Sequence, residues 1–210
     1  CITVIDPYEP TGEIEKDHKP YKPYRLFRNN RDGTFTEVTA EAGLSTIWPT
    51  IGAAWGDYND DGFPDLFVSN AMGRSQLYRN NGDGTFTNVA KELGVAVDAW
   101  AVAAGAADVN GDGWPDLFVA NDASPDRLFI NHEGKYFEDV AREAFPGQYG
   151  RVGMSAEMVD LDGDGLPEIY STKITARAYM TGRNELWKNL DGRHFRNEGL
   201  ALGVADCGWS

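Results

Sequence analysis

The chain has 210 residues, of which 41% are hydrophobic and 25% are charged, and its formal net charge at pH 7 is −14. This acidic excess argues against nucleic acids and anionic membrane surfaces as partners, because both attract basic patches. No stretch approaches the run of about 18 apolar residues that a membrane-spanning helix needs, so we expect no membrane span.

A short strand-and-turn element recurs along the chain, beginning at residues 26–30. There an apolar run ends in asparagine, and a polar turn and an aromatic residue follow. The same order returns at 77–86, 128–137 and 186–195. Clusters of Asn, Asp and Gly between apolar segments are typical of hairpin turns, so each copy predicts two antiparallel strands. These turns lack regular ligand spacing, and we assign no metal to them.

A nine-residue acidic loop occurs three times, at residues 57–65, 108–116 and 160–168. Oxygen-bearing side chains stand at loop positions 1, 3, 5 and 9, and glycine stands at position 6. Ca²⁺ takes roughly six to eight oxygen ligands, and glycine at the sixth position permits the sharp turn around the ion. The pattern predicts three Ca²⁺ sites, with the backbone carbonyl of position 7 as a further ligand. The predicted ligands are Asp57, Asn59, Asp61, Phe63 and Asp65; Asp108, Asn110, Asp112, Trp114 and Asp116; and Asp160, Asp162, Asp164, Leu166 and Glu168.

The spacing excludes the EF-hand, which is the most familiar acidic calcium loop. That motif requires a bidentate Glu at position 12 and a helix on each side. Position 12 is Val68, Val119 and Ser171 in the three copies, and the acid comes early, at position 9, after a proline. Short apolar runs follow each loop and are typical of buried strands, so we predict strand–loop–strand sites.

The loops start at residues 57, 108 and 160, which gives a period of 51 to 52 residues. One period predicts four strands: a small-residue strand before the loop, an apolar strand after it, and the hairpin pair. A repeat of roughly 40–50 residues with four strands is typical of a β-propeller blade. We therefore predict an all-β fold, a β-propeller of four-stranded blades with calcium loops between the first and second strands.

The repeats resemble the FG-GAP/VCBS type of integrin-α-like propellers and, more narrowly, the ASPIC/UnbV (cartilage acidic protein-like) group. Three segments carry the resemblance: 61–68, 77–87 and the closing Cys207-Gly208-Trp209-Ser210. The resemblance covers almost the whole chain. It implies a secreted, calcium-stabilised propeller, usually of seven blades, and it implies no catalytic residue.

The repeat register divides residues 1–210, a single propeller segment, into about three and a half blades. We expect a partial blade at 1–49, full blades at 50–100, 101–150 and 151–202, and the start of another repeat at 203–210. Unfinished blades leave unpaired strand edges and an uncovered face. We therefore expect either a piece of a longer propeller or association between copies. Cys1 and Cys207 could pair with each other or with cysteines outside the segment.

Calcium also indicates the compartment. Millimolar free calcium outside cells fills weak acidic loops that cytosolic calcium does not, so we expect an extracellular, cell-surface or periplasmic location. The sequence contains no Asn-x-Ser/Thr triplet, so sequon-type N-glycosylation is not expected.

The sequence offers no recognisable active site, and we predict no enzyme, no catalytic residue and no organic cofactor. His132 and His194 fall at hairpin turns, where a surface position explains them. Two longer connections, 6–24 and 171–184, break the repeat on the side opposite the calcium loops. They are either functionless insertions or a recognition face, since specificity is often carried by such loops.

Two functions follow. The first is a non-catalytic adhesion, interaction or structural module with a protein or glycan ligand, including a self-assembling variant that uses unfinished blade edges. The second is a carbohydrate-active propeller, a lectin or a calcium-dependent polysaccharide lyase. Its candidate residues are His18, Lys173, Arg177 and Arg183.

Overall fold

The computed structural model describes residues 2–4, 24–44, 50–71, 73–122, 124–148, 153–173 and 183–206, with the backbone alone in the first range. Within these ranges the regular structure is almost entirely β-strand, and the only α-helix is the four-residue α1 (Ala141–Ala144). No helix in this described part of the chain is long and apolar enough to cross a membrane.

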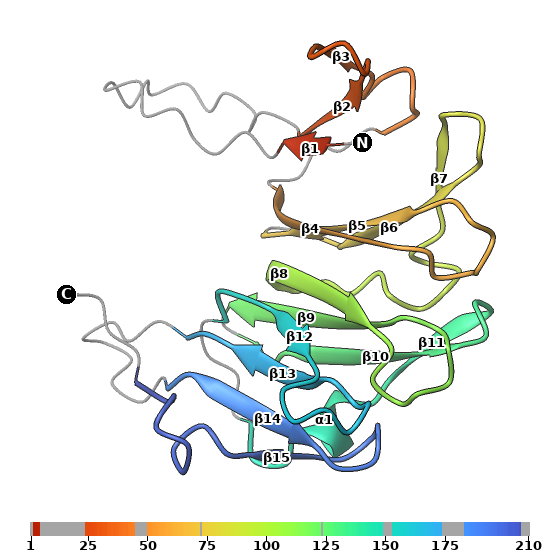
Figure 1. Cartoon of the computed structure of the whole chain (residues 1–210). Coiled ribbons are helices and arrows are strands. Elements are labelled where there is room, and N and C mark those ends of the chain that lie inside the picture. The colour runs from red at the N-terminus through yellow and green to blue at the C-terminus, as the bar shows by residue number, and fades with distance from the viewer. Residues whose placement is uncertain are drawn as a thin grey trace, which may run out of the picture.

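The strands form four antiparallel sheets that follow one another in chain order (Figure 1). We call them blades 1 to 4. Blade 1 consists of β1 (Ile2–Val4), β2 (Arg25–Asn29) and β3 (Phe35–Glu37); blade 2 of β4 (Thr50–Gly56), β5 (Asp65–Asn70), β6 (Gln76–Asn80) and β7 (Phe86–Asn88); blade 3 of β8 (Trp100–Ala107), β9 (Asp116–Asp122), β10 (Arg127–His132) and β11 (Tyr136–Asp139); and blade 4 of β12 (Glu157–Val159), β13 (Glu168–Ser171), β14 (Glu185–Asn189) and β15 (Phe195–Asn197).

Blades 2, 3 and 4 are meanders, because neighbouring strands in each sheet are also neighbours in sequence. In blade 1, β1 pairs with β2 as the second strand of the other blades pairs with the third. The prediction of an all-β chain of four-stranded blades is confirmed. The sheets form part of a β-propeller.

The second strand of a blade is buried on both faces, as its consecutive apolar residues predict. Every residue of β5 is buried. Leu66 and Val68 pack in the cluster shared with blade 1, whereas Phe67 packs in the cluster shared with blade 3. A strand covered on both faces by neighbouring sheets has no polar face. This explains why apolar and polar residues do not alternate along β5.

The first strand of a blade lies where neighbouring sheets converge, and this explains its small residues. A Cβ atom added to Gly52 in β4 would lie 2.6 Å from the backbone oxygen of Val102 in β8. A Cβ on Gly105 would lie 3.1 Å from the backbone oxygen of Ala156, next to blade 4. Larger side chains at these positions would push the blades apart.

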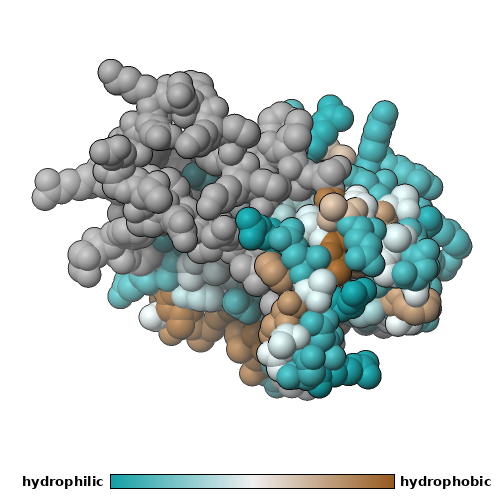
Figure 2. Space-filling model, turned by 90° about the horizontal axis from the view of Figure 1, so that it is seen from above, coloured by the Kyte–Doolittle hydropathy of each residue, from teal (hydrophilic) through white to brown (hydrophobic). Residues whose placement is uncertain are grey.

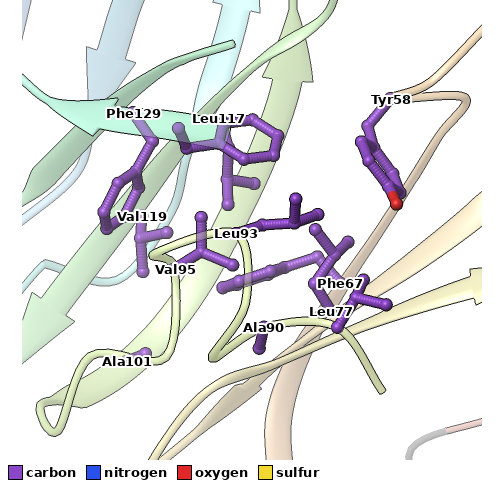
Figure 3. Packing of buried hydrophobic residues seen from close by; sticks show 12 residues of the cluster. Tyr58, Phe67, Leu77, Ala90, Leu93, Val95, Ala101, Leu117, Val119 and Phe129 are labelled. Atoms are coloured by element: carbon purple, nitrogen blue, oxygen red, sulfur yellow. The ribbon is translucent and has the colours of Figure 1, made fainter. Parts of the chain in front are cut away.

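Apolar packing joins blades 2 and 3 (Figure 3). Phe67 of blade 2 faces Leu117 and Phe129 of blade 3, and Leu93 and Val95 from the connection after β7 lie between the two sheets. All five side chains are buried. The segment that leaves one blade is therefore part of the core beneath the next.

A hydrogen bond between blades repeats with the same geometry. The side-chain Nδ2 of Asn131, the residue before the last of β10, donates to the backbone oxygen of Tyr58 at 2.8 Å. Asn189, at the end of β14, donates in the same way to Val109 at 2.8 Å. In blades 3 and 4 the asparagine at or next to the end of the third strand therefore binds the second residue of the acidic loop in the preceding blade.

The acidic loops and the third-to-fourth-strand hairpins lie on one side of the sheets (Figure 1). Figure 2 shows the molecule from the blade 1 end, and hydrophilic residues predominate at the same edge. The connections 6–24 and 171–184 lie largely outside the described residues, as do His18, Arg177, Cys1 and Cys207.

The outer face of blade 4 is apolar and exposed. Leu161, Leu202 and Val204 are 57%, 59% and 38% exposed. Their counterparts in the repeat, Val109, Leu93 and Val95, are buried because a following blade packs on them.

Candidate metal centres

Each acidic loop joins the first two strands of a blade. The loops connect β4 to β5, β8 to β9, and β12 to β13, and the acid at position 9 is the first residue of the second strand. This acid, Asp65, Asp116 or Glu168, is at most 2% exposed. The first eight residues form the turn, and the ninth fixes the turn to the sheet.

The turn is shaped by its own carboxylates. In the first loop, Asp57 Oδ2 accepts a hydrogen bond from the backbone nitrogen of Gly62 at 2.8 Å, and Asp61 Oδ1 accepts from Phe63 at 2.9 Å. The second and third loops repeat both bonds. The glycine at position 6 has φ between +84° and +91° in all three loops, a conformation that glycine adopts at little cost. The predicted turn at position 6 is present in each copy.

The position-9 aspartates are buried charges held by backbone N–H groups. Asp116 accepts from Val109 at 2.9 Å and from Asn131 at 2.8 Å, which links the loop to the third strand. Burial, together with the nearby Asp112 and Asp108 carboxylates, raises the pKa of Asp116 to about 7, although the hydrogen bonds from the backbone of Asn131 and Val109 lower it. The same causes raise the pKa of Asp65 to about 6. A cation beside these groups would offset both the burial and the repulsion.

The donor set fits a hard divalent cation. Carboxylate and amide oxygens are the ligands that Ca²⁺ prefers. Oxygens of Asp160, Asp162 and Glu168 lie within 4.8 Å of one another. In the first loop, Asn59 Oδ1 at position 3 is buried and accepts no hydrogen bond. A buried polar atom without a partner is costly, and a bound ion would satisfy it. The carbonyls of Phe63, Trp114 and Leu166 remain predicted ligands.

The loops are also enclosed by hairpins. Gly192, in the β14–β15 hairpin of blade 4, lies so close to the second loop that an added Cβ would be 2.5 Å from the Cα of Asn110. Gly134, in the β10–β11 hairpin of blade 3, approaches Asn59 of the first loop in the same way. The following blade therefore covers position 3 of the loop before it.

Comparison with known families identifies these repeats. The profile of the FG-GAP-like repeat matches residues 20–68, 57–119 and 108–171. The chain belongs to the FG-GAP-like repeat family. Each matched FG-GAP-like segment ends in or just after the second strand of a blade, so each includes a complete acidic loop.

The chain is also similar to cartilage acidic protein 1. It is 34% identical to that protein from Xenopus tropicalis over 155 residues, and 32% identical to that from Homo sapiens over 165 residues. The matches cover 70% and 75% of this chain, and 23% and 24% of the relatives. The chain spans about a quarter of the length of these relatives.

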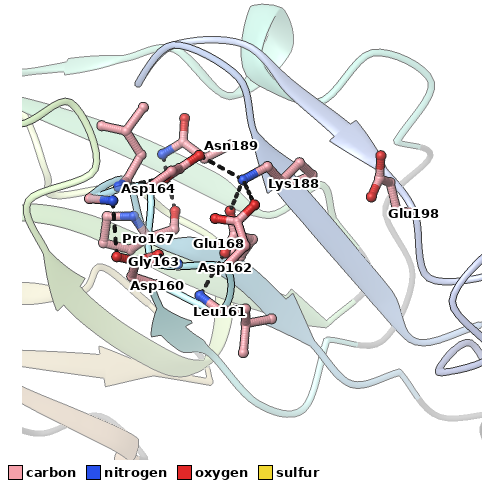
Figure 4. A network of polar contacts seen from close by, with 12 residues as sticks. Asp160, Leu161, Asp162, Gly163, Asp164, Pro167, Glu168, Lys188, Asn189 and Glu198 are labelled. Carbon is pink, nitrogen blue, oxygen red and sulfur yellow. Dashed lines mark hydrogen bonds and ion pairs between the residues drawn. The ribbon is translucent and has the colours of Figure 1, made fainter.

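Sequence reasoning missed one residue that contacts the third FG-GAP-like loop. Lys188, in β14, places its Nζ 2.5 Å from Asp162 Oδ2, 2.8 Å from Asp164 Oδ2 and 3.0 Å from Glu168 Oε1 (Figure 4). Hydrogen bonds to Asp162, Asp164 and Glu168 raise the pKa of Lys188 above its ordinary value. The sequence does contain a signal that this blade differs from the others: it has a lysine at the position where the other full blades have Arg79 and Ile130.

Of the four residues considered for carbohydrate chemistry, Lys173 and Arg183 are among the described residues, whereas His18 and Arg177 lie outside them. Lys173 is buried and paired with Asp126 and Glu185, so it presents no cation to a ligand. His132 contacts Glu138 and stacks on Tyr136, and His194 contacts Asp191. His194 is exposed in its turn, as expected, whereas His132 is the last residue of β10.

Proposed function

We propose that this FG-GAP-like segment is a non-catalytic, calcium-stabilised interaction module that works outside the cell. The observation that carries the proposal is the position-9 carboxylate, which is buried at the start of the second strand and bound to the third strand. An ion held by the loop through this group would bind the first three strands of a blade together. Calcium then has a structural role.

The expected energetics follow from linkage. An ion that binds the folded chain and not the unfolded one stabilises the fold by about 2.7 kcal/mol when its free concentration is 100 times Kd. Millimolar extracellular calcium would fill such loops, whereas cytosolic calcium would leave weak ones empty. This supports the extracellular placement, as does the similarity to cartilage acidic protein 1.

The interaction role uses the two surfaces that the calcium loops leave free. One is the side opposite the acidic loops, where the connections between the second and third strands of the blades lie and where a protein or glycan ligand would bind. The other is the outer face of blade 4, where Leu161, Leu202 and Val204 are exposed. The buried state of Lys173 weighs against a lyase at the first surface.

The proposal is tested with Asp112→Ala, which removes a carboxylate from the second loop. Asp83→Ala is the matched control, because Asp83 also shapes a turn, by accepting from the backbone nitrogen and the hydroxyl of Thr85, but lies outside the loops. Calorimetry should show one fewer tightly bound Ca²⁺ in Asp112→Ala and an unchanged number in Asp83→Ala. An unchanged number in both would overturn the assignment of the loops.

A further inference from the structure

Blade 4 departs from blades 2 and 3 at three positions of its metal centre. Loop position 3 is Asp162 instead of asparagine, loop position 9 is Glu168 instead of aspartate, and the residue before the last of β14 is Lys188. The counterparts are Asn59, Asp65 and Arg79 in blade 2, and Asn110, Asp116 and Ile130 in blade 3. The three changes meet in space (Figure 4).

The first change removes a donor from the loop. In blades 2 and 3 the amide at position 3 donates to the carboxylate at position 5, with Nδ2–Oδ2 distances of 2.8 and 2.9 Å. Asp162 cannot donate when it is ionised, and its carboxylate would repel that of Asp164. Lys188 Nζ bridges the two carboxylates instead.

The second change directs a position-9 oxygen toward the lysine. Asp65 and Asp116 each accept a backbone N–H from the third strand, from Asn80 and Asn131. Glu168 keeps the bond to the loop, from Leu161, through Oε2, and its Oε1 lies 3.0 Å from Lys188 Nζ. The longer side chain therefore reaches the ammonium group.

The charges of the three loops agree with this pairing. The first and second loops each carry three carboxylates at ligand positions, and the third loop carries four. One ammonium group in contact with the third loop brings its formal charge back to the −3 of the others. The added acid and the lysine offset each other.

We infer that Lys188 is a built-in cation of the third loop, and that Ca²⁺ must displace its ammonium group to bind there. The inference rests on the proposed calcium function of the loops. The ammonium group is held by oxygens at positions 3, 5 and 9, which are the groups assigned to the ion. The third loop thus has a side-chain cation among its ligand oxygens when calcium is absent. The matching positions of blades 2 and 3 hold Arg79, which is exposed, and Ile130, which carries no charge.

The test is calcium titration of the full 210-residue chain by calorimetry, with Lys188→Met and the control Arg79→Met. Arg79 stands at the matching strand position of blade 2 and is exposed. The wild type should bind two ions tightly, and Lys188→Met should bind a third, at least about tenfold tighter than the wild type does. Arg79→Met should match the wild type. Adding Asp164→Ala to Lys188→Met should abolish the third site, which assigns that ion to the third loop.

Each outcome has a distinct meaning. Identical numbers and affinities in the wild type and Lys188→Met would overturn the role of Lys188 and leave the calcium function intact. Absence of binding in every variant would overturn the calcium function and the inference together.

Metal-free stability gives a second readout. In chelator, Lys188→Met should melt at a lower temperature than the wild type, because the three carboxylates that contact Lys188 lose their counter-charge. Adding Ca²⁺ should restore the lost stability. A loss of stability that calcium does not restore would overturn the inference. Should Lys188→Met fail to fold, Lys188→Gln keeps a hydrogen-bond donor without the charge, and the same criteria apply to it.

Discussion

At the scale of single residues, the metal centres depend on a few side chains whose neighbours are fixed by the repeat. The carboxylate at position 1 and the glycine at position 6 shape the turn, and the buried acid at position 9 connects it to the strands. Gly192 adds a contact from the next blade, since its absent Cβ leaves room for Asn110 at position 3 of the second loop.

Replacing Gly192 with alanine should therefore weaken both the fold and the second loop. Its φ is +81°, and the added methyl would overlap Asn110, so we expect a loss of about 1–3 kcal/mol in the free energy of unfolding. Gly84→Ala is the control, since Gly84 has φ +92° and nothing within 4 Å of an added Cβ. Denaturant unfolding measures the loss, and equal effects of the two variants would show that the contact with Asn110 is unimportant.

At the scale of elements, charged contacts join blade 3 to blade 4. Lys173, after β13, contacts Asp126, before β10, at 2.5 Å and Glu185 at 3.3 Å, in a site where Lys173 and Asp126 are both buried. Burial raises the pKa of Asp126, although the ammonium of Lys173 acts in the opposite direction. On the loop side, Arg193 of blade 4 contacts Glu138 and Glu143 of the region around β11 and α1.

Substitutions of Lys173 and Asp126 should have strongly coupled effects on the free energy of unfolding. Lys173→Met leaves Asp126 without its counter-charge, and breaking a buried pair in this way typically costs about 3–5 kcal/mol. Adding Asp126→Asn should recover part of that loss, since the two effects are not independent. A double-mutant cycle by chemical denaturation measures the coupling, and additive effects would argue against the pairing.

The exposed contact should respond to pH. Hydrogen bonds from Arg193 lower the pKa of Glu138 to about 2. A lowered folded-state pKa gives stability that is present above the ordinary glutamate pKa and is lost as pH falls toward 2. Because both side chains are 40% exposed, we expect Arg193→Met to cost at most about 1 kcal/mol at pH 7 and less near pH 2. Thermal unfolding at both pH values measures this, and an equal loss at each would contradict it.

Contacts of this kind mark the limit of sequence reasoning. The strands, the order of the meander and the three turns could be predicted, because apolar runs, Asp-Gly turns and the position-6 glycine are local signals. The contact between Lys188 and Glu168 could not be predicted, because it depends on the strand register that pairs Ile169 with Trp187. Lys173 and Asp126 lie 47 residues apart and meet only because blade 3 packs on blade 4. The assignment of metal to the loops stays a prediction.

At the scale of the whole molecule, a repeated set of contacts joins neighbouring blades, and within the described residues the outer face of blade 4 lacks these contacts. Leu93 and Val95 are buried between blades 2 and 3, whereas their counterparts Leu202 and Val204 are exposed. An exposed apolar face whose counterpart is buried between blades 2 and 3 favours association with another sheet of the same kind.

This face should bring copies of the 210-residue chain together. We expect the apparent mass in solution to rise with protein concentration, and Leu202→Asp to reduce that rise by placing a charge on the face. Arg196→Gln, on the neighbouring strand β15, controls for the change in net charge, because it lowers the net charge by the same one unit. Light scattering across a concentration series measures the effect, and a constant monomer in the wild type would contradict it.

The central claim is that calcium held in the acidic loops stabilises the blades. Anomalous difference density from crystals grown with Ca²⁺ tests it most directly. The result expected is a peak among the side chains of positions 1, 3, 5 and 9 in the first and second loops, with a weaker peak, or Lys188 alone, in the third. Well-ordered blades with no peak in any acidic loop would contradict the claim.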